Sequence, residues 1–145
     1  MINIFSFSLY IPLFNEEEGI EHLFNNINDG LDEINSKCDL NIIFVDDGST
    51  DNTFQSLEKY FVGDSFEIIR HESNKNLGGF LKTAINHCDS DYIGFLDSDC
   101  SYSVSTLLEM LDFVSDGYEI INASPYHPDG LSLIHISEPT RPYLI

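Results

Sequence analysis

The chain has 145 residues, of which 42% are hydrophobic and 21% charged, as expected for one globular domain that buries a core. Its formal net charge of −19 argues against nucleic acid and anionic lipid as partners and is compatible with the recruitment of divalent cations. No stretch approaches the roughly 18 apolar residues that span a bilayer. Three cysteines without a C-x-x-C pair favour a reducing, cytoplasmic setting.

Short apolar runs alternate with helical stripes along the chain. Strands are predicted at residues 5–11, 41–45, 66–70, 92–96 and 118–123. Helices are predicted after Asn15 (as N-cap, with a stripe from Ile20 to Ile34), after Asp51, along the stripe Leu81, Ala84, Ile85 and Cys88, and from Val104 to a stop at Gly117. Pro12 should close the first strand, and Gly30 should bend or end the first helix. This alternation predicts an α/β fold, a mostly parallel sheet with helices on both faces.

The last residues differ in kind from the rest. "LSLIHISEPTR", residues 131–141, resembles the translation of a transposase-type sequencing-library adapter. We therefore expect residues 131–145 to be non-native and exclude them from the fold. The natural part then comprises residues 1–130 and ends within a domain.

Polar clusters follow three of the predicted strands. They are "PLFNEE" (12–17), "DDGSTD" (46–51) and "DSDCS" (97–101). Because ligands bind beyond the carboxyl ends of parallel strands in open sheets, these clusters predict one ligand site at that edge.

The pair Asp97 and Asp99 offers the hard oxygen ligands that suit Mg²⁺ or Mn²⁺. If both kept strand geometry they would point to one side, about 6.6 Å apart. At a dielectric of 20 their repulsion would be roughly 2.5 kcal/mol, which a cation between them would relieve. A solvated acidic surface is the alternative for any single carboxylate.

Other positions allow two interpretations each. Asp47 either belongs to a turn and helix cap or accepts hydrogen bonds from a base or ribose. Phe14 either packs in the core or stacks on a base. "NKNLGGFLKT" (74–83) lacks the phosphate-loop spacing, so Gly78 and Gly79 are better explained as a helix start. The histidines show no zinc-ligand spacing, and Cys100 has no partner histidine in reach by sequence.

Taken together, "IPLFNEEEGI", "VDDGSTDNT", "NKNLGG", "YIGFLDSDCS" and "ASPYHPDG" resemble the family 2 glycosyltransferases of the GT-A (Rossmann-like) fold. Among these, the chain looks like the dolichyl- or polyprenyl-phosphate mannosyltransferase type. The resemblance implies that Asp97 and Asp99 hold Mg²⁺ or Mn²⁺ on the diphosphate of a nucleotide-sugar. It also implies nucleotide-sugar contacts from Pro12, Phe14, Glu16, Val45, Asp47, Asp97 and the backbone of Ser98.

The resemblance further implies transfer of a sugar from a donor of the GDP-mannose or UDP-glucose type. The acceptor would be a polyprenyl phosphate, or another lipid or glycan, at the cytosolic face of a membrane. Pro125 stands where many mannosyltransferases carry an arginine. No residue is identified as the catalytic base, and we expect the chain to be inactive alone.

Three other classes of protein compete with this interpretation. A receiver domain has an acidic pair and a later aspartate, but it should also offer a lysine after a later strand, and residues 83–130 contain none. A haloacid-dehalogenase-type phosphatase carries its D-x-D motif after the first strand, not the fourth. A non-catalytic nucleotide-binding relative remains as the third alternative.

Overall fold

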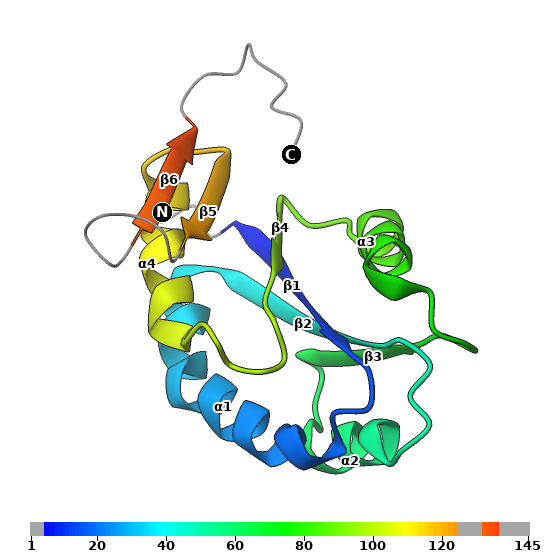
Figure 1. Ribbon diagram of the computed structural model, residues 1–145. Coiled ribbons are helices and arrows are strands. Elements are labelled where there is room, and N and C mark those ends of the chain that lie inside the picture. Colours follow the sequence, from blue (N-terminus) through cyan, green and yellow to red (C-terminus); the bar gives the residue numbers. More distant parts are fainter. Residues whose placement is uncertain (1–4, 125–131, 137–145) are drawn as a thin grey trace. The chain divides into compact units, whose positions relative to one another are not determined.

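The computed structural model describes residues 5–124 and 132–136. The chain divides into two compact units, Met1–Ser103 and Val104–Ile145. The first unit contains a four-stranded sheet of order β3-β2-β1-β4 in which all neighbouring strands are parallel (Figure 1). Its strands are β1 (Ser6–Leu13), β2 (Asp39–Asp46), β3 (Phe66–Arg70) and β4 (Tyr92–Phe95).

Helices cover both faces of this sheet, as the alternating sequence pattern predicted. Helices α1 and α2 lie on one face and α3 on the other (Figure 1). The bounds are Glu17–Gly19 for the 3₁₀ turn η1, Ile20–Lys37 for α1, Thr53–Tyr60 for α2 and Asn76–His87 for α3. Since Gly78 and Gly79 fall in the first turn of α3, the interpretation of this segment as a helix start is confirmed.

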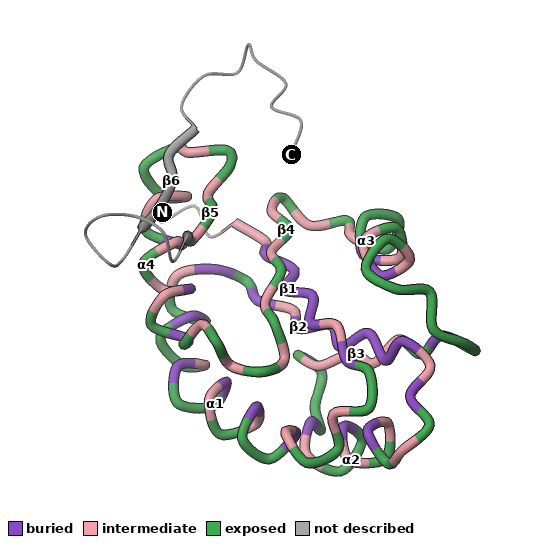
Figure 2. Tube along the Cα trace, viewed as in Figure 1, coloured by how far each residue is buried: buried purple, intermediate pink, exposed green. Residues whose placement is uncertain are grey.

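The core is densest around β1 and β2, which are buried along nearly their whole length (Figure 2). On the α3 face, Tyr10, Ile43 and Val45 pack with Phe80 and Ala84 from the helix. On the opposite face, Phe44 lies with its ring centroid 4.2 Å from that of Phe61, and the apolar side chains of α1 and α2 close over it. This two-sided burial is what an uninterrupted apolar strand such as β2 requires.

A hydrogen-bonded chain ties α3 to two strands. The Tyr10 hydroxyl lies 2.9 Å from Nδ1 of His87, and Nε2 of His87 lies 3.0 Å from Oε1 of Glu67 on β3. Tyr10 is fully buried, and this burial, followed by the negative charge of nearby Cys88, Glu67 and Asp89, raises its pKa to about 12. The far end of α3 is thereby held against the sheet.

Four expectations about individual residues were wrong. Strand β1 continues through Pro12 to Leu13. The backbone of Pro12 faces the side of β4, and β4 has already ended at Phe95, so the missing N–H of proline interrupts no strand pairing. Asn15 has a φ of 54° and bonds to a distant loop instead of capping a helix. Gly30 is buried inside α1 and does not end that helix. Ile85 is 64% exposed because Phe80 and Ala84 define the buried face of α3.

The second unit contains α4 (Val104–Ser115), β5 (Ile120–Ser124) and β6 (Ser132–Ile136). Gly117, with φ of 92°, ends α4 as expected, and its N–H bonds to the Val114 carbonyl. The fifth strand does not join the parallel sheet: β5 pairs with β6 in a separate antiparallel ribbon. Strand β6 lies within the adapter-like segment, whose non-native origin stays a prediction. Over the described part of the chain, no helix has the length and apolar character needed to cross a membrane.

Candidate functional site

The segments that follow β1 and β2 meet at the carboxyl edge of the sheet. Asn15 joins them: its backbone N–H donates to the Ser49 hydroxyl over 2.9 Å, and its side-chain oxygen accepts the Thr50 N–H over 2.8 Å. Asn15 reaches this geometry through its left-handed backbone, a conformation that asparagine tolerates better than most residues. Two of the three polar clusters are thus brought together as predicted.

Further bonds extend this junction toward α2. The Glu16 N–H donates to the Thr53 hydroxyl over 2.8 Å, and the Asn52 N–H donates to the Glu17 carboxylate over 2.8 Å. Asp51 accepts the Thr53 N–H over 2.9 Å, but it lies one residue before the N-cap of α2, which is Asn52. Burial works to raise the pKa of Asp51, but hydrogen bonds from Thr53 and Glu17 outweigh it and the net shift is downward.

Asp46, the last residue of β2, is fully buried and shapes the turn after the strand. Its Oδ1 accepts the Ser49 N–H over 3.0 Å, and its Oδ2 forms an ion pair with Nε of Arg70 at 3.2 Å. That Oδ2 has no well-aligned hydrogen bond within the described residues, so the ion pair is its main compensation. The Arg70 guanidinium also donates to the Ser49 carbonyl over 3.3 Å and lies over the Phe54 ring.

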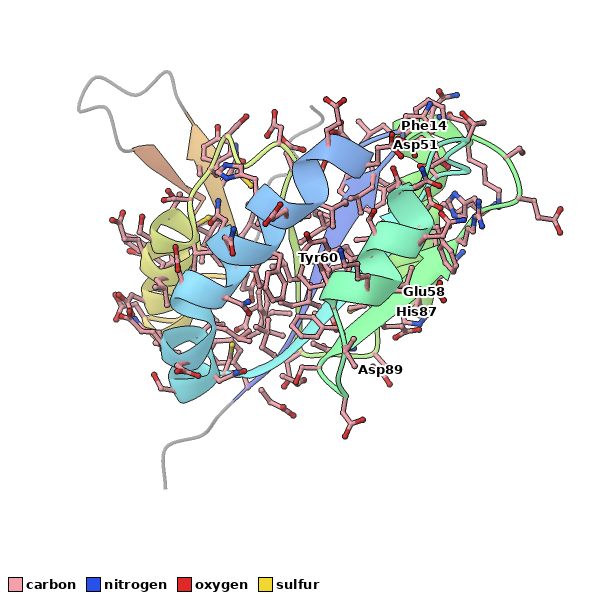
Figure 3. All side chains as sticks on the ribbon, turned by 90° about the horizontal axis from the view of Figure 1, so that it is seen from below. Phe14, Asp51, Glu58, Tyr60, His87 and Asp89 are labelled. Carbon is pink, nitrogen blue, oxygen red and sulfur yellow. The ribbon has the colours of Figure 1, made fainter. Side chains whose placement is uncertain are left out.

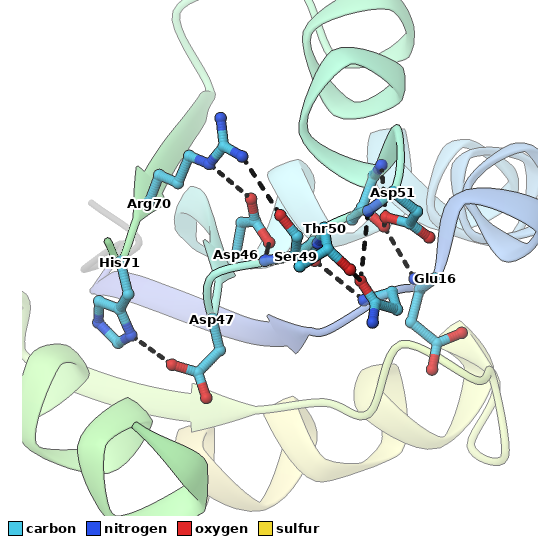
Figure 4. A network of polar contacts seen from close by, with 10 residues as sticks. Glu16, Asp46, Asp47, Ser49, Thr50, Asp51, Arg70 and His71 are labelled. Carbon is cyan, nitrogen blue, oxygen red and sulfur yellow. Dashed lines mark hydrogen bonds and ion pairs between the residues drawn. The ribbon is translucent and has the colours of Figure 1, made fainter. Parts of the chain in front are cut away.

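Asp47 is held from the opposite side, by the loop that follows β3 (Figure 4). Its Oδ1 lies 2.6 Å from Nδ1 of His71 and accepts the Lys75 N–H over 2.9 Å. Behind the imidazole, Nε2 of His71 lies 2.8 Å from the Thr83 hydroxyl on α3. Asp47 therefore does not cap a helix; of the two interpretations, the helix-cap one is wrong.

Gly48 permits these two loops to approach each other. Its φ is 75°, and a Cβ at this position would lie 2.7 Å from the Ser73 carbonyl carbon and 2.8 Å from the Asn74 nitrogen. Both neighbours are backbone atoms, which cannot turn aside as a flexible side chain would. Glycine is therefore required for the approach that lets Lys75 donate to Asp47.

The third cluster follows β4 at the same edge, because β4 pairs in parallel with β1. Strand β4 ends at Phe95, and a turn at Ser98 and Asp99 leads to Cys100, whose φ is 58°. Asp97 and Asp99 are both exposed but do not continue the strand, so the separation expected from strand geometry does not apply. Hydrogen bonds from the Ser101 side chain and backbone hold the pKa of Asp99 below its usual value, which keeps this carboxylate ionised.

Two ionised or ionisable carboxylates suit a particular kind of metal site. No cluster of three or more histidine, cysteine, aspartate or glutamate side chains that could hold a metal occurs among the described residues. Mg²⁺, however, is commonly bound by one or two carboxylates and completes its shell with water and substrate phosphates. Asp97 and Asp99 fit that arrangement and do not fit an all-protein cage.

The remaining nucleotide-binding candidates differ in how far they are accessible. Phe14 is 44% exposed, so the expectation that it packs in the core was wrong, and Figure 3 places it beside Asp51, away from His87 and Asp89. Val45 points into the α3-side core, which leaves only its backbone for a ligand. Pro12, Glu16 and Ser98 are half-buried.

Sequence reasoning missed three groups that shape the site: His71, the Lys75 N–H and Arg70. The available signal was positional, since Arg70 ends β3 and His71 follows it at the same carboxyl edge. Nothing in the local sequence linked these groups to Asp46 or Asp47, because His71 lies 24 residues and Lys75 28 residues from Asp47 and a contact between two loops leaves no local pattern.

A parallel α/β sheet with acidic loops gathered at its carboxyl edge defines a class of ligand-binding domain that includes nucleotide-binding enzymes. The comparison with known families is specific: the model of glycosyl transferase family 2 matches residues 8–134. The chain belongs to this family, and the resemblance seen in its motifs is confirmed.

Curated relatives are distant in sequence. The dolichol-phosphate mannosyltransferase of Pyrococcus furiosus is 25% identical over 123 residues, which cover 85% of this chain and 34% of that protein. The undecaprenyl-phosphate 4-deoxy-4-formamido-L-arabinose transferase of Proteus mirabilis is 27% identical over 116 residues, covering 79% and 35%. The chain thus spans about a third of the length of these relatives.

Solved structures place the fold in the GT-A group. The crystal structure of residues 1–349 of TarS from S. aureus superposes with a TM-score of 0.61 at 26% identity, covering 77% of this chain and 32% of that one. The mannosyltransferase PcManGT from Pyrobaculum calidifontis, solved with GDP-Man and Mn²⁺, gives a TM-score of 0.67 at 20% identity, covering 79% and 34%. These likenesses confirm the α/β fold with its parallel four-stranded sheet.

Proposed function

We propose that this chain is the donor-binding part of a sugar transferase that uses a nucleotide-sugar held through a divalent cation. The observation that carries the proposal is the convergence of three polar segments, after β1, β2 and β4, at one edge of the sheet. Family membership supports the reaction class, and the GDP-Man and Mn²⁺ bound to PcManGT support the ligand class.

Each segment has a distinct task in this proposal. Phe14 and Glu16, at the end of β1, border the nucleoside, where the exposed Phe14 ring offers a stacking surface. Asp47 accepts a hydrogen bond from the nucleoside. Asp97 and Asp99 hold Mg²⁺ or Mn²⁺ against the diphosphate, and the ion supplies charge neutralisation for the leaving group when bound.

Transfer makes demands that donor binding does not. An acceptor oxygen must be held within about 3–3.5 Å of the sugar carbon and in line with the leaving group. Among the described residues, we propose none as an acceptor contact or as a general base. Following the relatives' names, a polyprenyl phosphate is our leading acceptor, and we expect this chain to bind its donor without turnover.

Calorimetric titration of the purified chain with GDP and UDP, with and without Mn²⁺, tests the proposal. Asp97→Asn and Asp99→Asn should remove most of the Mn²⁺-dependent gain in affinity, whereas Asp29→Asn, an exposed aspartate on α1, should leave it unchanged. Equal affinity in the wild type and both site variants would contradict the metal bridge. Incubation with the matching sugar donors and a short polyprenyl phosphate then measures transfer, and robust turnover would show that the acceptor groups lie within this chain.

The non-catalytic alternative makes a different prediction. A non-catalytic protein should give the same nucleotide titrations. It should transfer no sugar, even when it is tested as a longer protein of the length of the curated relatives. The binding assay therefore tests the site, and turnover, by this chain or by a longer protein, tests the enzyme.

A further inference from the structure

His71 is the most enclosed polar side chain near the site that the sequence motifs do not explain. It is 5% exposed and lies between Asp47 on one side and Thr83 on the other. An ionised carboxylate only accepts hydrogen bonds, so Nδ1 of His71 must carry the proton that points at Asp47. The Thr83 hydroxyl can donate to Nε2 or accept from it, which fixes the ring plane in either case.

The consequence for Asp47 is an unequal pair of oxygens. Oδ1 takes both the His71 and the Lys75 hydrogen bonds, at 2.6 Å and 2.9 Å. Oδ2 has no hydrogen-bond partner among the described residues and points away from the imidazole (Figure 4). Asp47 as a whole is only 6% exposed, but Oδ2 is not a fully buried oxygen, so it stays open to a hydrogen-bond donor from solvent or from a ligand.

We propose that His71, supported by Thr83, is a positioning residue that fixes Asp47 through Oδ1 and leaves Oδ2 as an acceptor for one hydrogen-bond donor on the nucleoside. This inference rests on the proposed function and adds a residue to it. The donor on the ligand is an N–H of the base or a hydroxyl of the ribose, two sources that nucleotide analogues distinguish.

The role of His71 depends on its fixed direction. In His71→Ala, Oδ1 keeps only the Lys75 N–H, so the carboxylate can rotate about its terminal torsion and water can occupy the vacated volume. The loss of a hydrogen bond to a charged group corresponds to roughly a ten- to hundredfold weaker nucleotide affinity. In His71→Asn, the amide nitrogen can take the place of Nδ1 and donate to Oδ1, so most of the affinity should return.

Calorimetric titration of His71→Ala, His71→Asn and Thr83→Val tests this role, with His22→Ala as control because His22 is an exposed histidine on α1. Each protein is titrated, in Mn²⁺, with the tighter-binding of GDP and UDP and separately with pyrophosphate. We expect His71→Ala to lose roughly ten- to hundredfold in nucleotide affinity, and His71→Asn and Thr83→Val to lose less than about fivefold. Pyrophosphate affinity should stay within about twofold in all, because Asp47 does not bind the phosphates.

The analogue arm uses the same nucleotide methylated at the base N–H or lacking the ribose 2′-hydroxyl. The analogue that lacks the contacted donor should bind the wild type weakly and should bind His71→Ala as well as the parent nucleotide does. Parallel loss of nucleotide and pyrophosphate affinity, or no recovery in His71→Asn, would overturn the positioning role and leave the proposed function standing. If His71→Ala does not fold, the other two variants still test the positioning role of His71. That role would be overturned if Thr83→Val kept full nucleotide affinity while His71→Asn lost it. Absence of any Mn²⁺-dependent binding by the wild type would overturn both.

Discussion

Replacing Arg70 by methionine should destabilise the turn that carries Asp47. Asp46 is fully buried, and its Oδ2 faces the Arg70 Nε at 3.2 Å without another partner among the described residues. Methionine keeps an unbranched aliphatic side chain at this position but removes the guanidinium from Phe54 and leaves the buried carboxylate uncompensated. The variant therefore isolates the charge more than the packing.

The magnitude follows from the geometry of the ion pair. At 3.2 Å and an effective dielectric of 20, the gross attraction between Asp46 and Arg70 is about 5 kcal/mol. The Arg70 side chain is 43% exposed, so solvent screens part of this attraction. Removal of one partner of a fully buried pair costs about 3–5 kcal/mol. After a discount for exposure we expect the free energy of unfolding to fall by about 2–3 kcal/mol.

Urea denaturation followed by circular dichroism measures this loss. With a slope of about 1.5 kcal/mol per molar, the midpoint should fall by roughly 1.3–2 M urea. Lys59→Met is the matched control, because Lys59 also lies over an aromatic ring, that of Tyr60, but forms no ion pair within the described residues. We expect the control to lose less than about 1 kcal/mol.

A double-mutant cycle with Asp46→Asn separates the pair from its surroundings. The coupling between Asp46 and Arg70 should exceed about 1 kcal/mol. If Arg70→Met destabilised the chain no more than Lys59→Met, or if the cycle showed no measurable coupling, the ion pair would not stabilise this turn. Asp46 would then have to be solvated or paired in some other way.

Three other predictions concern backbone strain, burial and the end of the chain. Gly48→Ala should lower both stability and nucleotide affinity more than Gly63→Ala does. Both glycines have a positive φ, but only a Cβ on Gly48 meets backbone atoms within 4 Å. Equal losses of the two variants in denaturation and titration would contradict this expectation. The pKa of Tyr10 is raised from 10.0 to about 12, so between these values the folded chain keeps the tyrosine proton and the unfolded chain loses it. The free energy of unfolding should therefore decrease as the pH rises from 10.0 to about 12. Urea titrations of Tyr10→Phe should lack that component, and identical pH slopes would exclude it. Deletion of residues 131–145 should leave the melting temperature and ligand binding unchanged if they are foreign, and a large loss of stability would identify a native segment.

Much of the fold could be predicted because its determinants are local. The apolar run 41–45 lies within β2, and the predicted strand at 66–70 coincides with β3. Periodicity also placed the helices, since their buried stripes recur at helical spacing. The gathering of the polar segments at the carboxyl edge followed from parallel topology alone.

The site itself depends on contacts that no local pattern encodes. Asn15 has the chemistry of a cap, but its side chain satisfies N–H groups 35 residues further along the chain. His71 likewise acts on Asp47 across two loops. The turn after β4 redirects Asp97 and Asp99, which strand periodicity could not anticipate. The strand β5 was predicted, but its partner was not, because pairing is a tertiary choice.

The most direct test of the metal-bridged donor site is a crystal structure of this chain soaked with Mn²⁺ and the nucleoside diphosphate that binds it best. Anomalous scattering identifies the ion independently of any interpretation of the density. We expect one Mn²⁺ within about 2.5 Å of a carboxylate oxygen of Asp97 or Asp99 and of a diphosphate oxygen, with the nucleoside against Asp47. A Mn²⁺ bound elsewhere, or a nucleotide away from the carboxyl edge of the sheet, would contradict it.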